Sequence, residues 1–343
     1  MLDDQQYIKQ FDPQDALGIV EKQWQQLTHA FGVSFEAKAD IHNIVLGGMG
    51  GSGWPAEYMM TWPGVNVPFE VSRNYTVPKY VNQHTLFIAS SYSGNTEETI
   101  AQLHDAEEHK AQIVVMASGG KLQKLAEEKG YPLYLLPTGT QPRMSSFYFI
   151  SAFIELFIPL KLIDDSANEE RYGISEWLKT QTNSWRADVP TAQNPAKQLA
   201  QELIGRTVIV YSGPLMFPAA NKWKICFNEN AKNLAWANRY PEFNHNEFIG
   251  WSSHPVDKPF AVVEIRSSLE HQRIQKRFLV TEKLLSGKRP KPQVVVPEGE
   301  TVAQQLFWTS VLGDFVSIYL AILNGVNPTP VDLVEKFKLD LDK

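Results

Sequence analysis

The sequence predicts an α/β protein with two units, each a parallel β-sheet flanked by helices in a doubly wound arrangement. Short apolar segments alternate with segments of helical spacing over residues 43–135, which is the pattern of βαβ units. Residues 145–188 interrupt this pattern with helical spacing only, and the alternation resumes at residue 206. Two apolar segments of the first half are followed directly by loops rich in glycine and hydroxyl groups.

In the first half, apolar segments that predict strands are separated by segments of helical spacing. The predicted strands are "HNIVLGG", "VPFEVSR", "TLFIASS", "QIVVMAS" and "YPLYLLP". The predicted helices cover residues 14–30, the segment "SGWPAEYMMTW", and residues 95–109 and 119–129. The helix at 95–109 begins with "NTEE", polar and acidic residues that the helix dipole favours at this end.

In the second half, a polar stretch, "DDSANEERYG", predicts a domain boundary, which gives domains of residues 1–160 and 161–343. Helical spacing is found before this polar stretch, at residues 145–160, and again from within it onward, at residues 167–188. The elements predicted after it are the strand "RTVIVYSG", a helix at 217–233, a strand at 260–265, a helix at 270–286, the strand "PQVVVPEG", a helix at 301–325 and the final helical stretch "VDLVEKFKLDLDK".

Composition and charge narrow the class of protein. The chain has 343 residues, 43% of them hydrophobic and 20% charged, which is ordinary for a globular protein. Its net charge of −6 argues against nucleic acid as the main partner. A single cysteine, Cys226, excludes an internal disulfide and is consistent with the cytoplasm. We find no signal peptide and no apolar run of membrane-spanning length, and "VLGDFVSIYLAIL", which contains Asp314, predicts a buried helix.

The loops "LGGMGGSGW" and "SSYSGNTEET" both follow predicted parallel strands, at the sheet edge where open α/β folds bind ligands. Glycines let the backbone approach an anion, while helix-start amides and the hydroxyls of Ser91, Ser93 and Thr96 supply donors. We therefore predict a phosphate site. The alternative is that these hydroxyls serve only as turn and cap residues. Neither loop fits a nucleotide fingerprint, because no lysine follows the glycines and Ser52 replaces the last glycine of the dinucleotide pattern.

The segment "KICFNENAKNLAWANRYPEFNHNEFIGW" combines Glu229 with His245, an acid and a base suited to proton transfer. The alternatives are a solvent-facing helical glutamate and a surface-loop histidine. A metal site at His245 would match no known ligand spacing. Arg143, in "TGTQPRMSS", is a candidate ligand for an anion or oxyanion, with a solvated arginine as the alternative.

Five segments occur together in order: "GMGGSG", "SYSGNTEET", the Pro-Arg pair at 142–143, "NENAKN" and "PEFNHNE". Together they resemble the bifunctional phosphoglucose/phosphomannose isomerases of the sugar isomerase (SIS) domain superfamily, from about residue 40 to the C-terminus. The resemblance implies two SIS domains, each with a five-stranded parallel sheet, and a homodimer. It implies a phosphorylated sugar as substrate, with no metal and no redox cofactor.

The resemblance also implies roles for individual residues. Ser91, Ser93 and Thr96 would hold the sugar phosphate, with Gly51 and Ser52 close to the sugar. Glu229 would be the base that moves a proton between C2 and C1. Arg143 would stabilise the charge of the cis-enediol(ate), His245 from the partner subunit would open the sugar ring, and Lys338, with Lys336 as a rival, would supply a C-terminal site lysine.

These residues predict an aldose–ketose isomerase of glucose 6-phosphate and fructose 6-phosphate, with mannose 6-phosphate as a further candidate substrate. The main alternative is a non-catalytic sugar-phosphate-binding SIS regulator. Regulators of that kind usually carry a DNA-binding domain, for which the short acidic start leaves no room. An amino-sugar-phosphate isomerase is disfavoured because no cysteine lies near Met1, and a nucleotide-dependent dehydrogenase because the glycine motif fits poorly.

Overall fold

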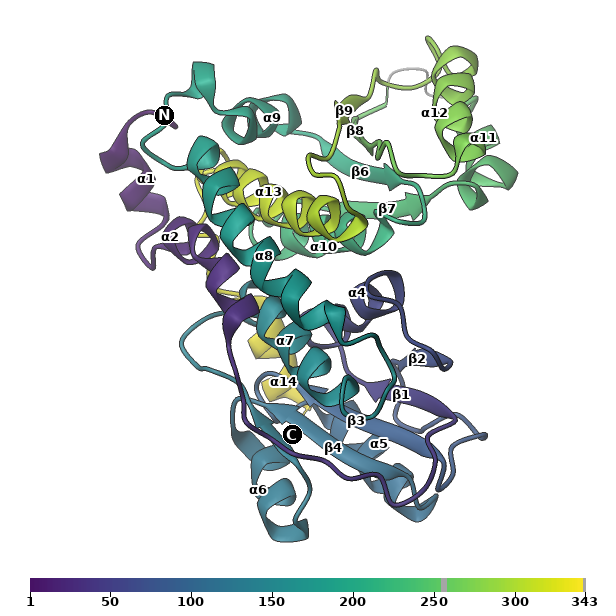
Figure 1. Cartoon of the computed structure of the whole chain (residues 1–343). Coiled ribbons are helices and arrows are strands. Elements are labelled where there is room, and N and C mark those ends of the chain that lie inside the picture. The colour runs from purple at the N-terminus through teal and green to yellow at the C-terminus, as the bar shows by residue number, and fades with distance from the viewer. Residues whose placement is uncertain (254–257, 342–343) are drawn as a thin grey trace. The chain divides into compact units, whose positions relative to one another are not determined.

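The computed structural model describes residues 1–253 and 258–341. The chain divides into two compact units, and each contains one sheet (Figure 1). The first unit is Lys22–Lys179, and the second unit combines Met1–Glu21 with Thr180–Lys343. Every strand pair formed by the described residues is parallel. The predicted α/β class with two parallel sheets is therefore confirmed.

The sheet of the first unit has five strands in the order β2-β1-β3-β4-β5, as the resemblance implies. Each strand lies within an apolar segment that predicted it. The strands are β1 (Asn43–Gly47), β2 (Phe69–Ser72), β3 (Thr85–Ser91), β4 (Gln112–Ala117) and β5 (Leu133–Leu135). The order reverses direction at β1, because the chain first adds β2 on one side of it and then β3 on the other.

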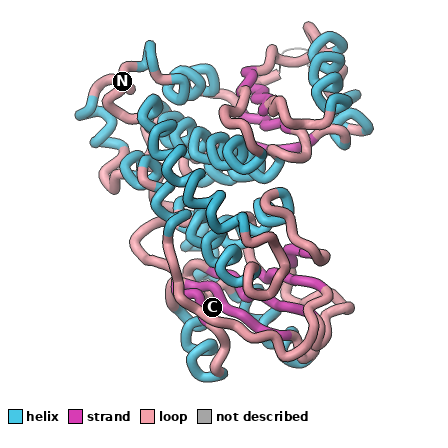
Figure 2. Tube along the Cα trace, in the orientation of Figure 1, coloured by secondary structure: helices cyan, strands magenta, loops and turns pink. Residues whose placement is uncertain are grey.

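Helices flank the first sheet, as Figure 2 shows. Side chains of α5 and α6 pack into one apolar core with Val45, Phe87 and Val115 of the strands. At the edge strand, Phe69 of β2 contacts Phe153 and Phe157 of α7. The helices of this unit are η1 (Gln23–Thr28), α3 (Gly50–Gly53), α4 (Pro55–Thr61), α5 (Glu97–Glu108), α6 (Gly120–Lys129), η2 (Pro142–Met144), α7 (Ser146–Phe157) and α8 (Ser166–Gln181).

The sheet of the second unit has four strands in the described part of the chain, in the order β7-β6-β8-β9. The strands are β6 (Thr207–Ser212), β7 (Ala235–Arg239), β8 (Phe260–Ile265) and β9 (Gln293–Val295). The described residues of this unit therefore form four strands rather than the five that the resemblance implies. The sequence interpretation also missed β7, because it is an edge strand with an exposed Trp236 and does not form an apolar run.

In the second unit, α10 contacts β6 and β7, and α13 packs on α10 and α9. A separate aromatic core joins Tyr211 and Val262 of the strands to Phe278 of α12. The helices are α1 (Gln5–Phe11), α2 (Ala16–Glu21), η3 (Thr182–Trp185), η4 (Thr191–Gln193), α9 (Pro195–Leu203), α10 (Phe217–Glu229), η5 (Glu242–His245), α11 (Glu247–Gly250), α12 (Gln272–Leu284), α13 (Val302–Leu323) and α14 (Asp332–Leu341).

Helix α13 forms the core of the second unit. By length and composition it could cross a membrane, so the expectation that no segment reaches that length is wrong. Its most apolar window is 94% buried inside the protein, which confirms the prediction of a buried helix. Asp314 of α13 forms an ion pair with Lys222 of α10 and accepts a hydrogen bond from Cys226 Sγ at 3.0 Å. This buried pair holds α10 against α13, because a buried charge needs a partner.

The helical spacing predicts a helix that continues to residue 233. In the structure α10 ends earlier, at Glu229. Lys232 adopts a left-handed backbone conformation with φ of 49°, which cannot continue a right-handed helix. Its ammonium group donates to the carbonyl oxygens of Glu229 at 2.9 Å and Asn327 at 2.7 Å. Lys232 therefore caps the helix and ties its end to the segment that leads to α14.

A buried carboxyl group in the second unit, Glu270, is expected to make stability depend on pH. Burial raises the pKa of Glu270 from its ordinary value of 4.5 to about 7, although backbone hydrogen bonds from Leu215 and Met216 oppose this rise. Between these two values the folded protein binds more protons than the unfolded chain. The contribution of Glu270 to the free energy of unfolding is therefore largest at low pH and is lost as pH rises through about 7.

We predict that Glu270→Gln removes this contribution. Relative to the wild type, the variant should gain stability between pH 5 and pH 8, by at most about 1.4 kcal/mol per pH unit. Urea denaturation at four pH values measures the difference, and the exposed Glu300→Gln is the matched control. Parallel pH profiles for the wild type and Glu270→Gln would contradict the prediction.

Candidate active site

The hydroxyl groups of residues 91–96 form one cluster at the carboxyl end of β3. Ser91 Oγ lies 2.7 Å from Thr96 Oγ1 and 3.5 Å from Ser93 Oγ. Ser91 is buried, Thr96 is half-buried at the N-cap of α5, and Ser93 is exposed. The cluster therefore runs from the sheet to the surface beside a helix start, where the helix dipole favours an anion.

The path of this loop depends on Gly94, which has a φ of +68°. A Cβ at Gly94 would lie 1.8 Å from the carbonyl oxygen of Gly119, so no other residue fits without a rearrangement. The loop after β4 also braces it, because the Lys121 N–H donates to Asn95 Oδ1 at 3.1 Å. Sequence reasoning missed this bracing loop, although "ASGG" directly after an apolar strand is the same kind of signal.

The glycine-rich loop after β1 is bonded to the hydroxyl loop. Ser52 Oγ accepts the Tyr92 N–H at 2.9 Å, and Ser90 Oγ donates to the Ser52 carbonyl oxygen at 2.8 Å. A Cβ on Gly51 would lie 3.0 Å from the backbone nitrogen of Arg143, so the two backbones approach closely. The structure therefore brings together Gly51, Ser52, Ser91, Ser93, Thr96 and the backbone of Arg143, all in the first unit.

Arg143 is 1% exposed, so the alternative of a solvated arginine is wrong. It lies in η2, and its Nη1 is 3.5 Å from Gln141 Oε1. A buried guanidinium group attracts negative charge strongly, because the surrounding protein screens it less than water does. Its residue type and burial therefore suit stabilisation of an oxyanion.

The other predicted residues lie in the second unit. Glu229 is the last residue of α10 and is half-buried. Lys338 and its rival Lys336 lie on α14, where both are exposed, and Lys338 Nζ pairs with Glu335 at 2.8 Å. The structure does not choose between these two lysines, so the C-terminal site lysine stays a prediction.

Glu229 and His245 lie at opposite ends of the second sheet. The residue before Glu229, Asn228, donates to the carbonyl oxygen of Ala235, the first residue of β7, at 3.0 Å. His245 is exposed in η5, beyond the last residue of β7. A strand of five residues spans about 16 Å. Glu229 therefore ends the helix that contacts the start of β7, whereas His245 lies beyond the end of that strand.

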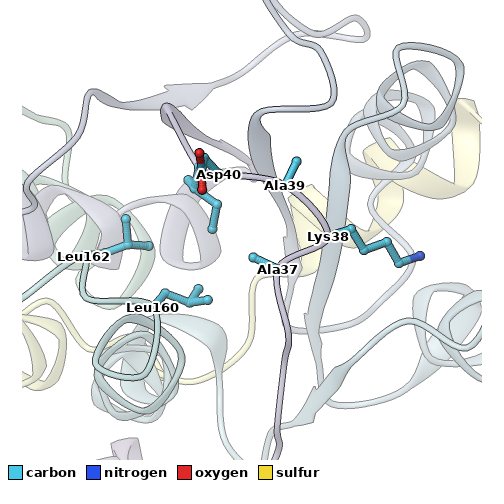
Figure 3. Close-up of a pocket in the computed structure, with 7 residues that line it drawn as sticks. Ala37, Lys38, Ala39, Asp40, Leu160 and Leu162 are labelled. Atoms are coloured by element: carbon cyan, nitrogen blue, oxygen red, sulfur yellow. The ribbon is translucent and has the colours of Figure 1, made fainter.

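A surface pocket of the first unit is lined by residues 37–41 with Leu160 and Leu162 (Figure 3). Residues 37–41 lead into the amino end of β1, whereas the hydroxyl cluster follows the carboxyl end of β3. In a parallel sheet these are opposite edges, so this pocket is separate from the candidate site. Among residues 1–253 and 258–341, no three His, Cys, Asp or Glu side chains are placed to hold a metal ion.

Two parallel α/β units, one with a hydroxyl cluster at its switch point, agree with the SIS class that the sequence resembles. Residues 192–341 match the family described as the bacterial phospho-glucose isomerase C-terminal SIS domain. A glucose-6-phosphate isomerase-like protein from Thermus thermophilus shares the fold, with a TM-score of 0.66 at 18% identity over 97% of this chain and 99% of that one.

The sequence relatives narrow this class to one family. The chain is 34% identical over 314 residues to the bifunctional phosphoglucose/phosphomannose isomerase of Caldicellulosiruptor bescii, covering 89% of this chain and 91% of the relative. It is 32% identical over 303 residues to the enzyme of the same name from Aquifex aeolicus, covering 88% and 90%. The chain belongs to the bifunctional phosphoglucose/phosphomannose isomerase family.

Proposed function

We propose that this chain is an aldose–ketose isomerase that interconverts glucose 6-phosphate and fructose 6-phosphate, and also accepts mannose 6-phosphate. The observation that carries the proposal is the cluster of Ser91, Ser93 and Thr96, whose hydroxyls meet at the helix start after β3. Hydroxyl and backbone donors of this kind suit a phosphate monoester. Membership of the isomerase family supports the reaction.

In the proposed mechanism, Glu229 removes the proton from C2 of the open-chain aldose. The electrons of the C–H bond form the C1–C2 double bond, and the C1 carbonyl oxygen takes the negative charge, which Arg143 stabilises. Glu229 then returns the proton to C1, while the proton of the C2 hydroxyl passes to the C1 oxygen and C2 becomes the ketose carbonyl. One base and one charge-stabilising donor are sufficient for this proton transfer.

Acceptance of both hexoses follows from the same intermediate. C2 is planar in the cis-enediol(ate), so glucose 6-phosphate and mannose 6-phosphate give the same species. The aldose that forms depends on the face of C2 that receives the proton. The proposal therefore places the choice between these products in which face of C2 is turned toward Glu229.

We also propose a cytoplasmic homodimer in which His245 of the partner subunit completes each site. The separation of Glu229 and His245 along β7 within one chain supports this arrangement. A neutral imidazole has one nitrogen that accepts a proton and one that donates, so it can transfer a proton from the anomeric hydroxyl to the ring oxygen and open the sugar.

His245→Ala is expected to lower the rate with cyclic hexose 6-phosphates by about 10²-fold. Solvent-deuterium exchange at C2 of a tetrose 4-phosphate should change little, because this sugar cannot close a five- or six-membered ring. Comparing the two rates measures the effect, and His104→Ala, at another exposed histidine, is the control. Equal losses on both substrates would contradict a ring-opening role.

The proposed activity is tested by a coupled assay. Fructose 6-phosphate is supplied, and the formation of glucose 6-phosphate and of mannose 6-phosphate is followed separately. Turnover to both products is expected. Binding of sugar phosphate without turnover would instead favour the non-catalytic regulator.

A further inference from the structure

Both sheets have the same kind of switch point, where the strand order changes direction. It lies between β1 and β3 in the first sheet and between β6 and β8 in the second. Open α/β sheets bind ligands beyond the carboxyl ends of the strands at such a point. In the first sheet the two loops there are the glycine-rich loop and the hydroxyl loop. In the second sheet they are residues 213–216 and 266–271.

In the second sheet a side chain of the protein, Glu270, fills this place. Glu270 Oε1 accepts the Leu215 N–H at 2.8 Å, and the carboxyl group also accepts a backbone hydrogen bond from Met216. These amides directly precede α10, a helix of 13 residues. Glu270 is only 4% exposed, so it covers them from solvent. A carboxyl group on amides at a helix start takes the position of a bound anion.

The surrounding residues indicate a built site as well. A Cβ on Gly213 would lie 2.2 Å from Glu270 Oε1, so the backbone approaches the carboxyl group as closely as glycine allows. The hydroxyl of Ser212, at the end of β6, is buried and has no hydrogen-bond partner within residues 1–253 and 258–341. A donor that the protein does not use therefore lies one residue from Gly213.

The loop after β8 differs from the hydroxyl loop in how its hydroxyl group is used. Ser267 Oγ donates to Gln305 of α13 and accepts the Leu269 N–H at 3.0 Å, so this hydroxyl is used within the protein. In the first unit, by contrast, Ser91 Oγ lies beside the hydroxyls of both Ser93 and Thr96. The second loop therefore binds its own unit together instead of presenting a cluster of hydroxyls.

We propose that the second sheet keeps an anion-binding position and that the Glu270 carboxyl group occupies it. The wild-type chain then binds one phosphate rather than two, and truncation of Glu270 opens a second phosphate site. The expectation that the wild type binds one phosphate rests on the proposed function of the hydroxyl cluster. The contacts of Glu270 do not depend on that proposed function.

Isothermal titration with inorganic phosphate tests this proposal. Glu270→Ala should bind one phosphate per chain more than the wild type. In a Ser93→Ala/Thr96→Ala background, the chain with Glu270→Ala should bind one phosphate and the chain with Glu270 should bind none. Glu270→Gln, which keeps the side-chain volume and an acceptor oxygen, should match the wild type. Equal phosphate counts for Glu270→Ala and the wild type in both backgrounds would overturn the proposal. If the wild type binds no phosphate and Glu270→Ala binds one, the result supports the proposal for the second sheet. The same result would refute the phosphate site at the hydroxyl cluster of the first sheet.

A second measurement covers the case in which Glu270→Ala does not fold without an anion. Thermal denaturation in phosphate and in chloride at equal ionic strength should give Glu270→Ala a higher Tm in phosphate, because a ligand that binds only the folded state stabilises it. In the Ser93→Ala/Thr96→Ala background this gain should persist for Glu270→Ala and be absent for Glu270→Gln. The same Tm in both salts for Glu270→Ala would overturn the proposal.

Discussion

Replacing Glu229 with glutamine is expected to lower kcat for fructose 6-phosphate by about 10³-fold while KM changes less than about threefold. Glutamine keeps the size of the side chain and one acceptor oxygen, but it cannot accept a proton from carbon at neutral pH. An interaction made only in the transition state affects kcat and kcat/KM equally, so the two should fall together.

The structure makes this variant a clean test. Glu229 ends α10, and Lys232 holds its backbone carbonyl at 2.9 Å, so the side-chain substitution leaves that cap in place. Glu202→Gln is the matched control, because Glu202 is an exposed glutamate in the last turn of α9 in the same unit. Steady-state kinetics of both variants give the comparison. Full turnover by Glu229→Gln would remove this residue from the mechanism.

The double variant Ser93→Ala/Thr96→Ala is expected to raise KM for hexose 6-phosphates by about 10²-fold. A hydrogen bond to a charged group contributes about 1.5–3 kcal/mol, and each 1.4 kcal/mol is about tenfold in affinity. The loss of two such bonds is partly compensated, because Ser91 and the loop amides remain. The inhibition constant of inorganic phosphate should rise in parallel, because the same donors hold both ligands.

Competitive inhibition by phosphate separates this role from a structural one. Thr96 Oγ1 contacts Ser91 Oγ at 2.7 Å, so the double variant also tests whether the loop keeps its shape. Ser184→Ala, at an exposed serine of η3, is the control for loss of a hydroxyl. Unchanged KM and phosphate inhibition would refute the phosphate assignment, even if kcat fell.

Much of the fold could be predicted from local pattern. The strands β1, β3, β4, β6 and β8 are mostly apolar runs between segments of helical spacing, which is typical of parallel strands covered on both faces. The sequence did not predict β7, because an edge strand is half exposed and its sequence need not be apolar. The sequence did not predict where α10 ends, because that end depends on a hydrogen bond from Lys232 to the carbonyl oxygen of Asn327. These two residues are far apart in the sequence.

The sequence by itself determined the α/β class, the two sheets, the loops that follow β1 and β3, and the family resemblance. These features depend on local apolar periodicity, on glycines and hydroxyls at strand ends, and on motif order. Only the tertiary structure decided that Arg143 is buried and that its backbone meets Gly51. It also decided that Glu229 and His245 lie beyond opposite ends of β7 and that Glu270 covers the amides before α10. All of these features have the same physical reason. Burial and proximity depend on which distant segments pack together, and no local sequence pattern determines that packing.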